Sequence, residues 1–146
     1  TSIFLDFDQL EAFNNRLQEK YAAIAAAEVQ YEELQCEDAD IILVAYGISS
    51  RIAKTAVAQA RAAGLRVGLF RPQTLFPFPS QRLHRLAEQS AARRFISVEM
   101  SNGQMADDVR LAISCSRPVE VVNRLGGNLL SLDKVMAKIQ TLSATK

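Results

Sequence analysis

The sequence has no tryptophan, one histidine and only two cysteines, Cys36 and Cys115, among its 146 residues. The cysteines lie far apart and form no CxxC pair, which argues against a zinc site or a disulfide framework and fits a reducing compartment. No apolar run approaches the roughly 20 residues that a membrane-spanning helix needs. The start of the chain also lacks the basic and apolar segments of a signal peptide. We therefore expect a cytoplasmic protein without membrane contact.

A charge excess of one sign is also missing, because 17 Lys and Arg face 16 Asp and Glu. This balance gives no support for nucleic-acid binding. The charges are nevertheless unevenly placed: residues 1–38 carry nine acids and two bases, and residues 39–146 carry fifteen bases and seven acids. We therefore divide the chain into an acidic arm, 1–38, and a basic body, 39–146. Either the arm lies on a basic surface, or the two parts are solvated faces of different sign.

The arm has the pattern of a long amphipathic helix. Asp8 and Glu11 have the spacing of a capping box. One apolar stripe recurs at helical spacing through Leu10, Phe13, Leu17, Tyr21, Ile24 and Tyr31. The spacing predicts a helix over residues 9–33. We expect its stripe to dock on the body or on a second copy of the chain, which would make a homodimer.

The body alternates apolar runs with helical patterns. Runs at 41–46, 65–70, 95–98 and 119–122 read as buried strands, because they are continuously apolar or β-branched. Helices are predicted from a cap at Ser49 or Ser50 to Gly64, and over 80–90, 104–114 and 131–142. This alternation predicts an α/β fold, a three-layer sandwich with a mostly parallel sheet. In such sheets ligands and partners meet the carboxyl ends of the strands.

The loop after the first predicted strand of the body holds the candidate anion-binding residues. Gly47, Ser49, Ser50 and Arg51 stand where a helix begins. Free backbone N–H groups and the helix dipole favour an anion there, so phosphate or carboxylate binding is one interpretation. Ordinary helix capping in a tight turn is the other. The loop matches neither the P-loop nor the GxGxxG pattern.

A second candidate lies at the end of the predicted strand 95–98. Glu99 leaves a buried strand, and Asn102 and Gln104 follow in the turn before the next helix. Such a glutamate either serves as an acid or base, or accepts hydrogen bonds from a neighbouring loop and holds that loop in place. The histidine, His84, lies in a charged helix with no Ser or Cys at a recognisable spacing. We therefore assign no catalytic residue and no metal ligand.

Several linked motifs resemble one family. They are Ile42-Leu43-Val44-Ala45-Tyr46-Gly47 with Ser50-Arg51-Ile52-Ala53-Lys54, then Arg71-Pro72-Gln73-Thr74-Leu75-Phe76-Pro77-Phe78-Pro79, and then Val98-Glu99-Met100 with Asn102-Gly103-Gln104-Met105 and Asp108-Val109-Arg110. In order and spacing across 40–125 they are similar to the transketolase-C-terminal-type domain of the alpha subunit of 2-oxoacid:ferredoxin oxidoreductases. One departure is Asn123-Arg124-Leu125-Gly126-Gly127, where that family often has Gly-Arg-Pro-Gly-Gly.

The resemblance implies an enzyme that oxidises a 2-oxo acid to an acyl-coenzyme A and passes the electrons to ferredoxin. It implies thiamine diphosphate, magnesium, iron–sulfur clusters and coenzyme A in the whole enzyme, with none of them bound by this fragment. The fragment itself is then inactive and serves contacts with other domains and subunits. The loop sequences are most similar to those of the branched-chain (2-oxoisovalerate) enzymes, with 2-oxoglutarate and pyruvate enzymes as alternatives. Two other functions stay open: a stand-alone anion- or nucleotide-binding module, and a pure assembly domain.

Overall fold

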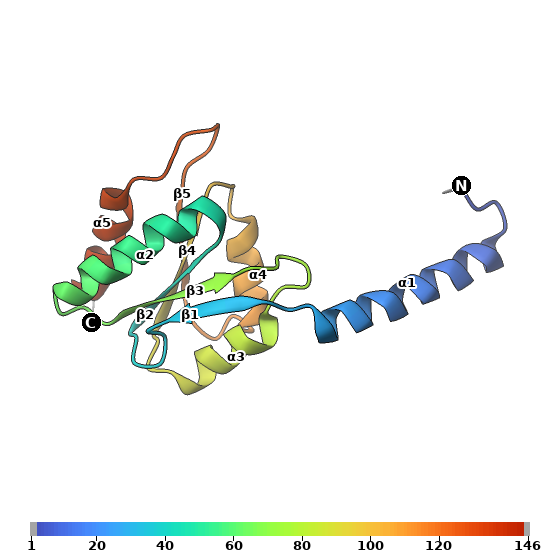
Figure 1. The fold of residues 1–146 in the computed structure, drawn as a ribbon, viewed down its shortest axis with the longest axis horizontal. Helices are drawn as coiled ribbons and strands as arrows, with labels where there is room; N and C mark the ends of the chain where they lie inside the picture. Colours follow the sequence, from blue (N-terminus) through green and yellow to red (C-terminus); the bar gives the residue numbers. More distant parts are fainter. Residues whose placement is uncertain (1–2, 145–146) are drawn as a thin grey trace.

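Five strands form one sheet in the order β1-β3-β2-β4-β5 in a computed structural model, which describes residues 3–144 (Figure 1). The elements in chain order are α1 (Phe7–Ala27), β1 (Tyr31–Leu34), β2 (Ile41–Ala45), α2 (Gly47–Ala62), β3 (Val67–Pro72), α3 (Ser80–Gln89), β4 (Arg94–Glu99), α4 (Gln104–Ala112), β5 (Val119–Asn123) and α5 (Leu132–Ala144). The predicted α/β fold with a mostly parallel sheet is confirmed.

Strands β2 to β5 run parallel, and β1 pairs antiparallel with β3 at one edge. Ala45 of β2 lies beside Val98 of β4, and Glu99 of β4 lies beside Asn123 of β5. Because these strands share one direction, their carboxyl ends meet at the same edge of the sheet.

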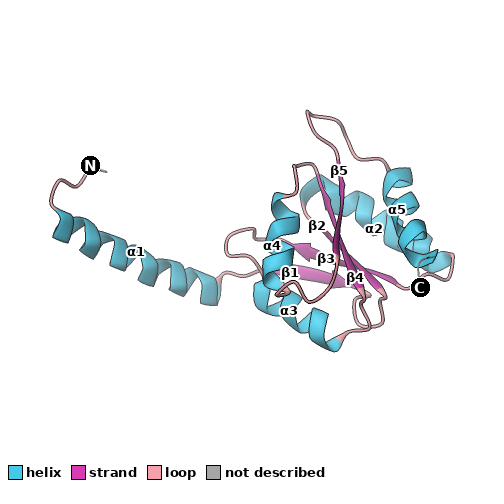
Figure 2. Ribbon diagram, turned by 180° about the vertical axis from the view of Figure 1, so that it is seen from behind, coloured by secondary structure: helices cyan, strands magenta, loops and turns pink. Residues whose placement is uncertain are grey.

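Helices cover both faces of the sheet and make the three layers (Figure 2). On one face, α2 and α5 pack over a cluster that includes Leu43, Leu69 and Ile96. On the other, α3 and α4 pack over a cluster that includes Phe70 and Phe95. Successive strand residues point to opposite faces, so neighbours such as Leu69 and Phe70 serve different cores.

The arm differs from the predicted helix 9–33 at both ends. Asp6, not Asp8, caps α1 by accepting a hydrogen bond from the Gln9 N–H at 2.9 Å. The helix ends at Ala27, and Tyr31, expected on its apolar stripe, instead begins strand β1. The Tyr31 ring stacks on Phe70 with 5.3 Å between centroids. Pairing with β3 therefore overrides the helical spacing of this segment.

Acidic residues of β1 and of the turn after it pair with arginines of the body. The Arg71 guanidinium donates to Glu32 at 2.9 Å, and Arg82 donates to Glu33 at 2.5 and 2.8 Å. Asp38 accepts two bonds from Arg61, each of 2.7 Å. The division at residue 38 stays a prediction, but these pairs join residues 31–38 to the body.

The turn after β1 passes directly over β3. A Cβ atom at Gly68 would lie 2.6 Å from the Gln35 carbonyl oxygen and 2.9 Å from the Cys36 Cα, closer than side chains tolerate. The Cys36 thiol is buried there and donates to the Leu69 carbonyl at 3.2 Å. Glycine at position 68 thus permits the close approach that seats Cys36 in the core.

Helix α1 projects away from the body (Figure 1). None of its residues is buried. Near its end, the Tyr21 ring meets Phe76 edge-on at 5.7 Å between centroids. The prediction that the stripe docks on its own body is therefore wrong. The alternative, docking on a second copy of the chain, stays a prediction. Within residues 3–144, no helix has the length and apolar content needed to cross a bilayer.

Candidate functional site

The carboxyl edge of the sheet carries both groups of candidate residues, on opposite faces. Gly47, Ser49, Ser50 and Arg51 belong to the first turns of α2. Glu99 ends β4 and bonds to the first turn of α4 on the other face. The two groups therefore share an edge without forming one site.

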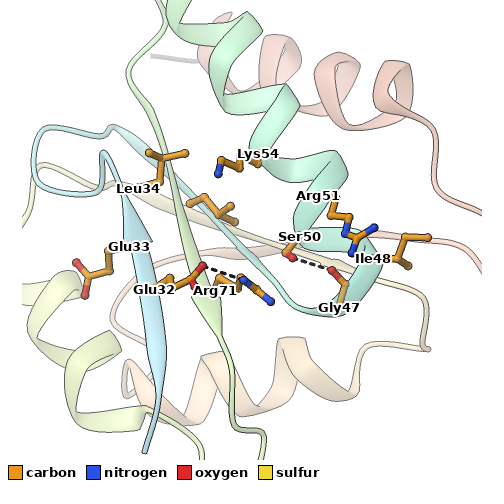
Figure 3. A pocket seen from close by; sticks show the side chains of 10 residues that line it. Glu32, Glu33, Leu34, Gly47, Ile48, Ser50, Arg51, Lys54 and Arg71 are labelled. Atoms are coloured by element: carbon orange, nitrogen blue, oxygen red, sulfur yellow. Dashed lines mark hydrogen bonds and ion pairs between the residues drawn. The ribbon is translucent and has the colours of Figure 1, made fainter.

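On the α2 face, a pocket of about 730 Å³ opens between α2 and strands β1 and β3 (Figure 3). Its lining includes the apolar Leu34, Ile48 and Leu69 and the cationic Arg51, Lys54 and Arg71. Glu32 neutralises Arg71 from the side, and Figure 3 shows Glu33 pointing away from this space. Arg51 and Lys54 form no ion pair within residues 3–144. The pocket lining thus combines three cationic side chains and two acidic residues with apolar side chains.

The start of α2 lacks a side-chain cap. Tyr46 occupies the cap position and makes no capping bond. The prediction that Ser49 or Ser50 caps this helix is wrong: Gly47, at φ +54°, already starts the helix, and Ser50 Oγ donates to the Gly47 carbonyl at 2.7 Å. The first N–H groups of α2 are left for another acceptor. Arg71 Nε is also buried without a hydrogen-bond partner.

On the α4 face, the Glu99 side chain performs the capping of α4. Gly103, at φ +97°, holds the cap position and has no side chain to bond with. Glu99, fully buried, accepts from the Met105 and Ala106 N–H groups at 3.2 and 3.1 Å. These are the second and third N–H groups of the helix, which a capping side chain normally satisfies.

Two hydroxyls complete the surroundings of the Glu99 carboxylate. Ser97 Oγ donates to it at 2.7 Å, and Ser101 Oγ makes a second, short bond. Asn123 on β5 donates from Nδ2 to the Ser101 carbonyl at 2.9 Å and fixes the turn. This arrangement corresponds to the loop-holding interpretation of Glu99.

Sequence reasoning found Glu99 but not all of its partners. The side chains of Asn102 and Gln104, which were predicted to act beside Glu99, are exposed. The hydrogen bonds to the Glu99 carboxylate come instead from Ser97, Ser101 and the backbone of α4. Ser97 stands two residues before Glu99, which places both side chains on one face of β4. That spacing is a signal the sequence does contain.

Two residue types that often serve catalysis, the histidine and the buried cysteine, lie outside both groups. His84 lies on α3 and faces Glu88 at 3.3 Å. Burial, assisted by the Glu33 charge, raises the pKa of the Cys36 thiol to about 12, which suppresses the nucleophilic thiolate. No group of His, Cys, Asp and Glu side chains in this part of the chain has the arrangement of a metal site.

Comparisons with known proteins agree on one kind of enzyme. Residues 39–135 match the family model "Pyruvate:ferredoxin oxidoreductase core domain II". The chain is 61% identical over 98% of its length to ketoisovalerate oxidoreductase subunit VorB of Methanothermobacter marburgensis, and covers 40% of that protein. It is 38% identical over 70% of its length to 2-oxoglutarate synthase subunit KorA of the same organism, and covers 27% of that protein. The chain thus spans about two fifths or less of these relatives.

Two solved structures share the fold. A 2-oxoglutarate:ferredoxin oxidoreductase from Magnetococcus marinus, with 2-oxoglutarate, coenzyme A and succinyl-CoA bound, matches 94% of this chain with a TM-score of 0.78 at 16% identity, over 24% of its own chain. A split-gene transketolase, an inactive tetramer, matches 77% of this chain with a TM-score of 0.64 at 20% identity, over 40% of its own chain.

Proposed function

The chain belongs to the family of pyruvate:ferredoxin oxidoreductase core domain II, and from this premise we propose that it serves as a non-catalytic, assembly-forming domain of a 2-oxoacid:ferredoxin oxidoreductase. The observation that carries the proposal is the 61% identity to a VorB subunit across 98% of the chain. That subunit is named as part of an oxidoreductase of ketoisovalerate. We therefore propose a branched-chain 2-oxo acid as the substrate of the whole enzyme.

The whole enzyme would decarboxylate the 2-oxo acid, transfer the acyl group to coenzyme A and send two electrons through iron–sulfur clusters to ferredoxin. Thiamine diphosphate with magnesium would supply the carbanion chemistry of the decarboxylation. The residues of this chain do not fit an iron–sulfur cluster, because two cysteines cannot provide its four thiolate ligands. We assign these groups, and the contacts with ferredoxin, to other domains and subunits in the same cytoplasmic complex.

Within that complex, we assign Glu99 and the turn with Asn102 and Gln104 to a domain or subunit contact near the active-site mouth. The bonds from Ser97, Ser101 and the α4 backbone support this role, because they give the turn one fixed shape. The exposed Asn102 and Gln104 side chains then stand outward on a rigid support. A preorganised loop of this kind loses little entropy on binding a partner.

A second candidate function is an anion-binding module that uses Gly47, Ser49, Ser50 and Arg51. The observation that favours it is the uncapped start of α2 beside Arg51 and Lys54 in the pocket of about 730 Å³. Titration calorimetry of the chain with coenzyme A, phosphate and nucleotides separates the two candidates. The assembly proposal expects no tight binding, and dissociation constants below about 10 µM, roughly −7 kcal/mol, would favour the module.

Copurification tests the proposal itself. A tagged chain expressed in its own organism should bring down thiamine-binding and ferredoxin-like subunits in fixed ratio. The purified complex should reduce a viologen dye with 2-oxoisovalerate faster than with 2-oxoglutarate or pyruvate. A chain that purifies alone under mild conditions would contradict the assembly role. Faster turnover of 2-oxoglutarate would contradict only the choice of substrate.

A further inference from the structure

The apolar stripe of α1 is covered only in part within residues 3–144, by Phe4 beside Phe13 and Phe76 beside Tyr21. Leu10 and Tyr21 are 37% and 40% exposed, and no residue of the helix is buried. In proteins most of the stability of an amphipathic helix comes from packing its apolar face. The stripe therefore leaves an open apolar surface that a partner can cover.

The stripe continues into an exposed part of the body. Tyr21 touches Phe76, which lies in the loop between β3 and α3 and is 70% exposed. Leu75 beside it is 45% exposed. At the other end of the helix, Phe4 packs on Phe13 with 4.9 Å between ring centroids. Helix α1 and this loop thus form one surface, defined here as the α1 surface: Leu10, Phe13, Leu17, Tyr21 and Ile24 of the helix with Leu75 and Phe76 of the loop.

A unit with this fold, including most of α1, occurs within a much longer chain. The match to the 2-oxoglutarate:ferredoxin oxidoreductase covers 94% of this chain, so only about nine residues lie outside it, and most of the 21-residue helix is included. The transketolase match covers 77%. The match covers 24% of that longer chain, so most of that chain lies outside the matched unit and can support a helix that projects from its own domain.

A second copy of the chain is the obvious other occupant, because the apolar residues of the stripe are spaced symmetrically on either side of Leu17. An antiparallel pair centred there would set Leu10 opposite Ile24 of the copy. The charges oppose it: the same pairing sets Asp6 opposite Glu28 and brings the two Arg16 side chains together. Like charges placed opposite each other destabilise a helix pair.

We propose that the α1 surface docks onto the part of a VorB-type subunit that lies outside these 146 residues. The inference rests on the proposed function, namely that the chain assembles into a 2-oxoacid:ferredoxin oxidoreductase. The occupant presents an apolar groove about 30 Å long, the length of a 21-residue helix. A basic group at one end of the groove would meet Glu28, and acidic groups at its centre would meet Arg16 and Lys20.

Hydrogen–deuterium exchange tests this docking in the assembled oxidoreductase and in the isolated chain. We expect amides of residues 7–27 to exchange at least about 10-fold more slowly in the complex, because docking removes local opening of the helix. Residues 41–45 of β2, which are buried in the sheet, should be protected equally in both samples. Leu17→Asp should cut the fraction of assembled complex, and Asn15→Asp, about 160° around the helix from Leu17 and exposed, should leave it unchanged. The melting temperature of both variant chains should stay unchanged.

Three results would overturn the inference, each in its own way. If the complex forms but α1 exchanges as fast as in the isolated chain, the docking surface lies elsewhere and the proposed function stands. If α1 is already protected in the isolated chain, more so at higher concentration, a second copy is the occupant. If no complex forms with the unaltered chain, the proposed function falls together with the inference.

Discussion

Replacing Glu99 by Gln tests whether the carboxylate holds the β4–α4 turn. Each carboxylate oxygen accepts one hydroxyl and one backbone N–H, from Ser97 with Ala106 and from Ser101 with Met105. An amide nitrogen in either place would face a backbone N–H, and a hydroxyl can rotate whereas a backbone N–H cannot. One buried donor therefore loses its acceptor, and the other bonds lose their ionised partner.

The expected cost of Glu99→Gln is about 2–4 kcal/mol, since an unsatisfied buried donor costs about 1–3 kcal/mol and bonds to charged groups are stronger than neutral ones. For a chain of this size the melting temperature should fall by roughly 5–15 °C. Thermal unfolding followed by circular dichroism measures the shift. Glu88→Gln is the matched control, because Glu88 is exposed on α3, and should change stability by less than about 0.5 kcal/mol. A shift for Glu99→Gln as small as that of the control would refute the reasoning.

In the assembled oxidoreductase, Glu99→Gln should lower stability or assembly more than turnover per assembled complex. The reason is that the bonds of Glu99 all go to its own domain. Normal assembly with a turnover reduced by about 100-fold or more, the range of a general acid or base, would make Glu99 catalytic and the assignment wrong.

Three further predictions concern the thiol, an ion pair and the arm. Cys36, whose pKa burial raises to about 12, should stay unreactive toward a disulfide reagent at pH 8 until guanidinium unfolds the chain; rapid labelling of both thiols in the native state would contradict it. The hydrogen bond from Lys138 lowers the pKa of Glu120. The ion pair therefore stabilises the fold at pH values above the usual glutamate pKa, and this stabilisation is lost as the pH falls through the lowered pKa. Lys138→Gln should therefore destabilise at pH 7 and have a fading effect below about pH 4.5, and a pH-independent effect in urea unfolding would contradict this. Deleting residues 1–28 should leave the melting temperature of the body nearly unchanged, whereas deleting 1–34 removes β1 and should lower it clearly; equal effects would contradict the role of β1.

The parallel strands could be predicted from the sequence because burial on both faces gives them uninterrupted apolar runs. The run predicted at 41–46 is strand β2 at Ile41–Ala45, and the run at 95–98 lies within β4 at Arg94–Glu99. Strand β1 was missed. Its Tyr31 keeps the helical spacing of the arm, and its strand pairing depends on β3 about 40 residues away. No local pattern contains that information.

The candidate sites were predicted in part, for a similar reason. Glu99 could be found because a carboxylate at the end of a buried strand needs bonding partners. The pocket could not, because Glu32, Lys54 and Arg71 come from three separate elements that only the folded sheet brings together. The α1 surface needed the structure as well, since the stripe alone does not say whether the body covers it.

The most direct test of the account compares turnover by the isolated chain and by the complex that contains it. Both samples receive 2-oxoisovalerate, coenzyme A, thiamine diphosphate and magnesium, and viologen reduction is followed. The account predicts no reduction by the chain alone and clear reduction by the complex. Turnover by the chain alone, in a preparation shown to be free of other subunits, would contradict the claim that this domain serves assembly and not catalysis.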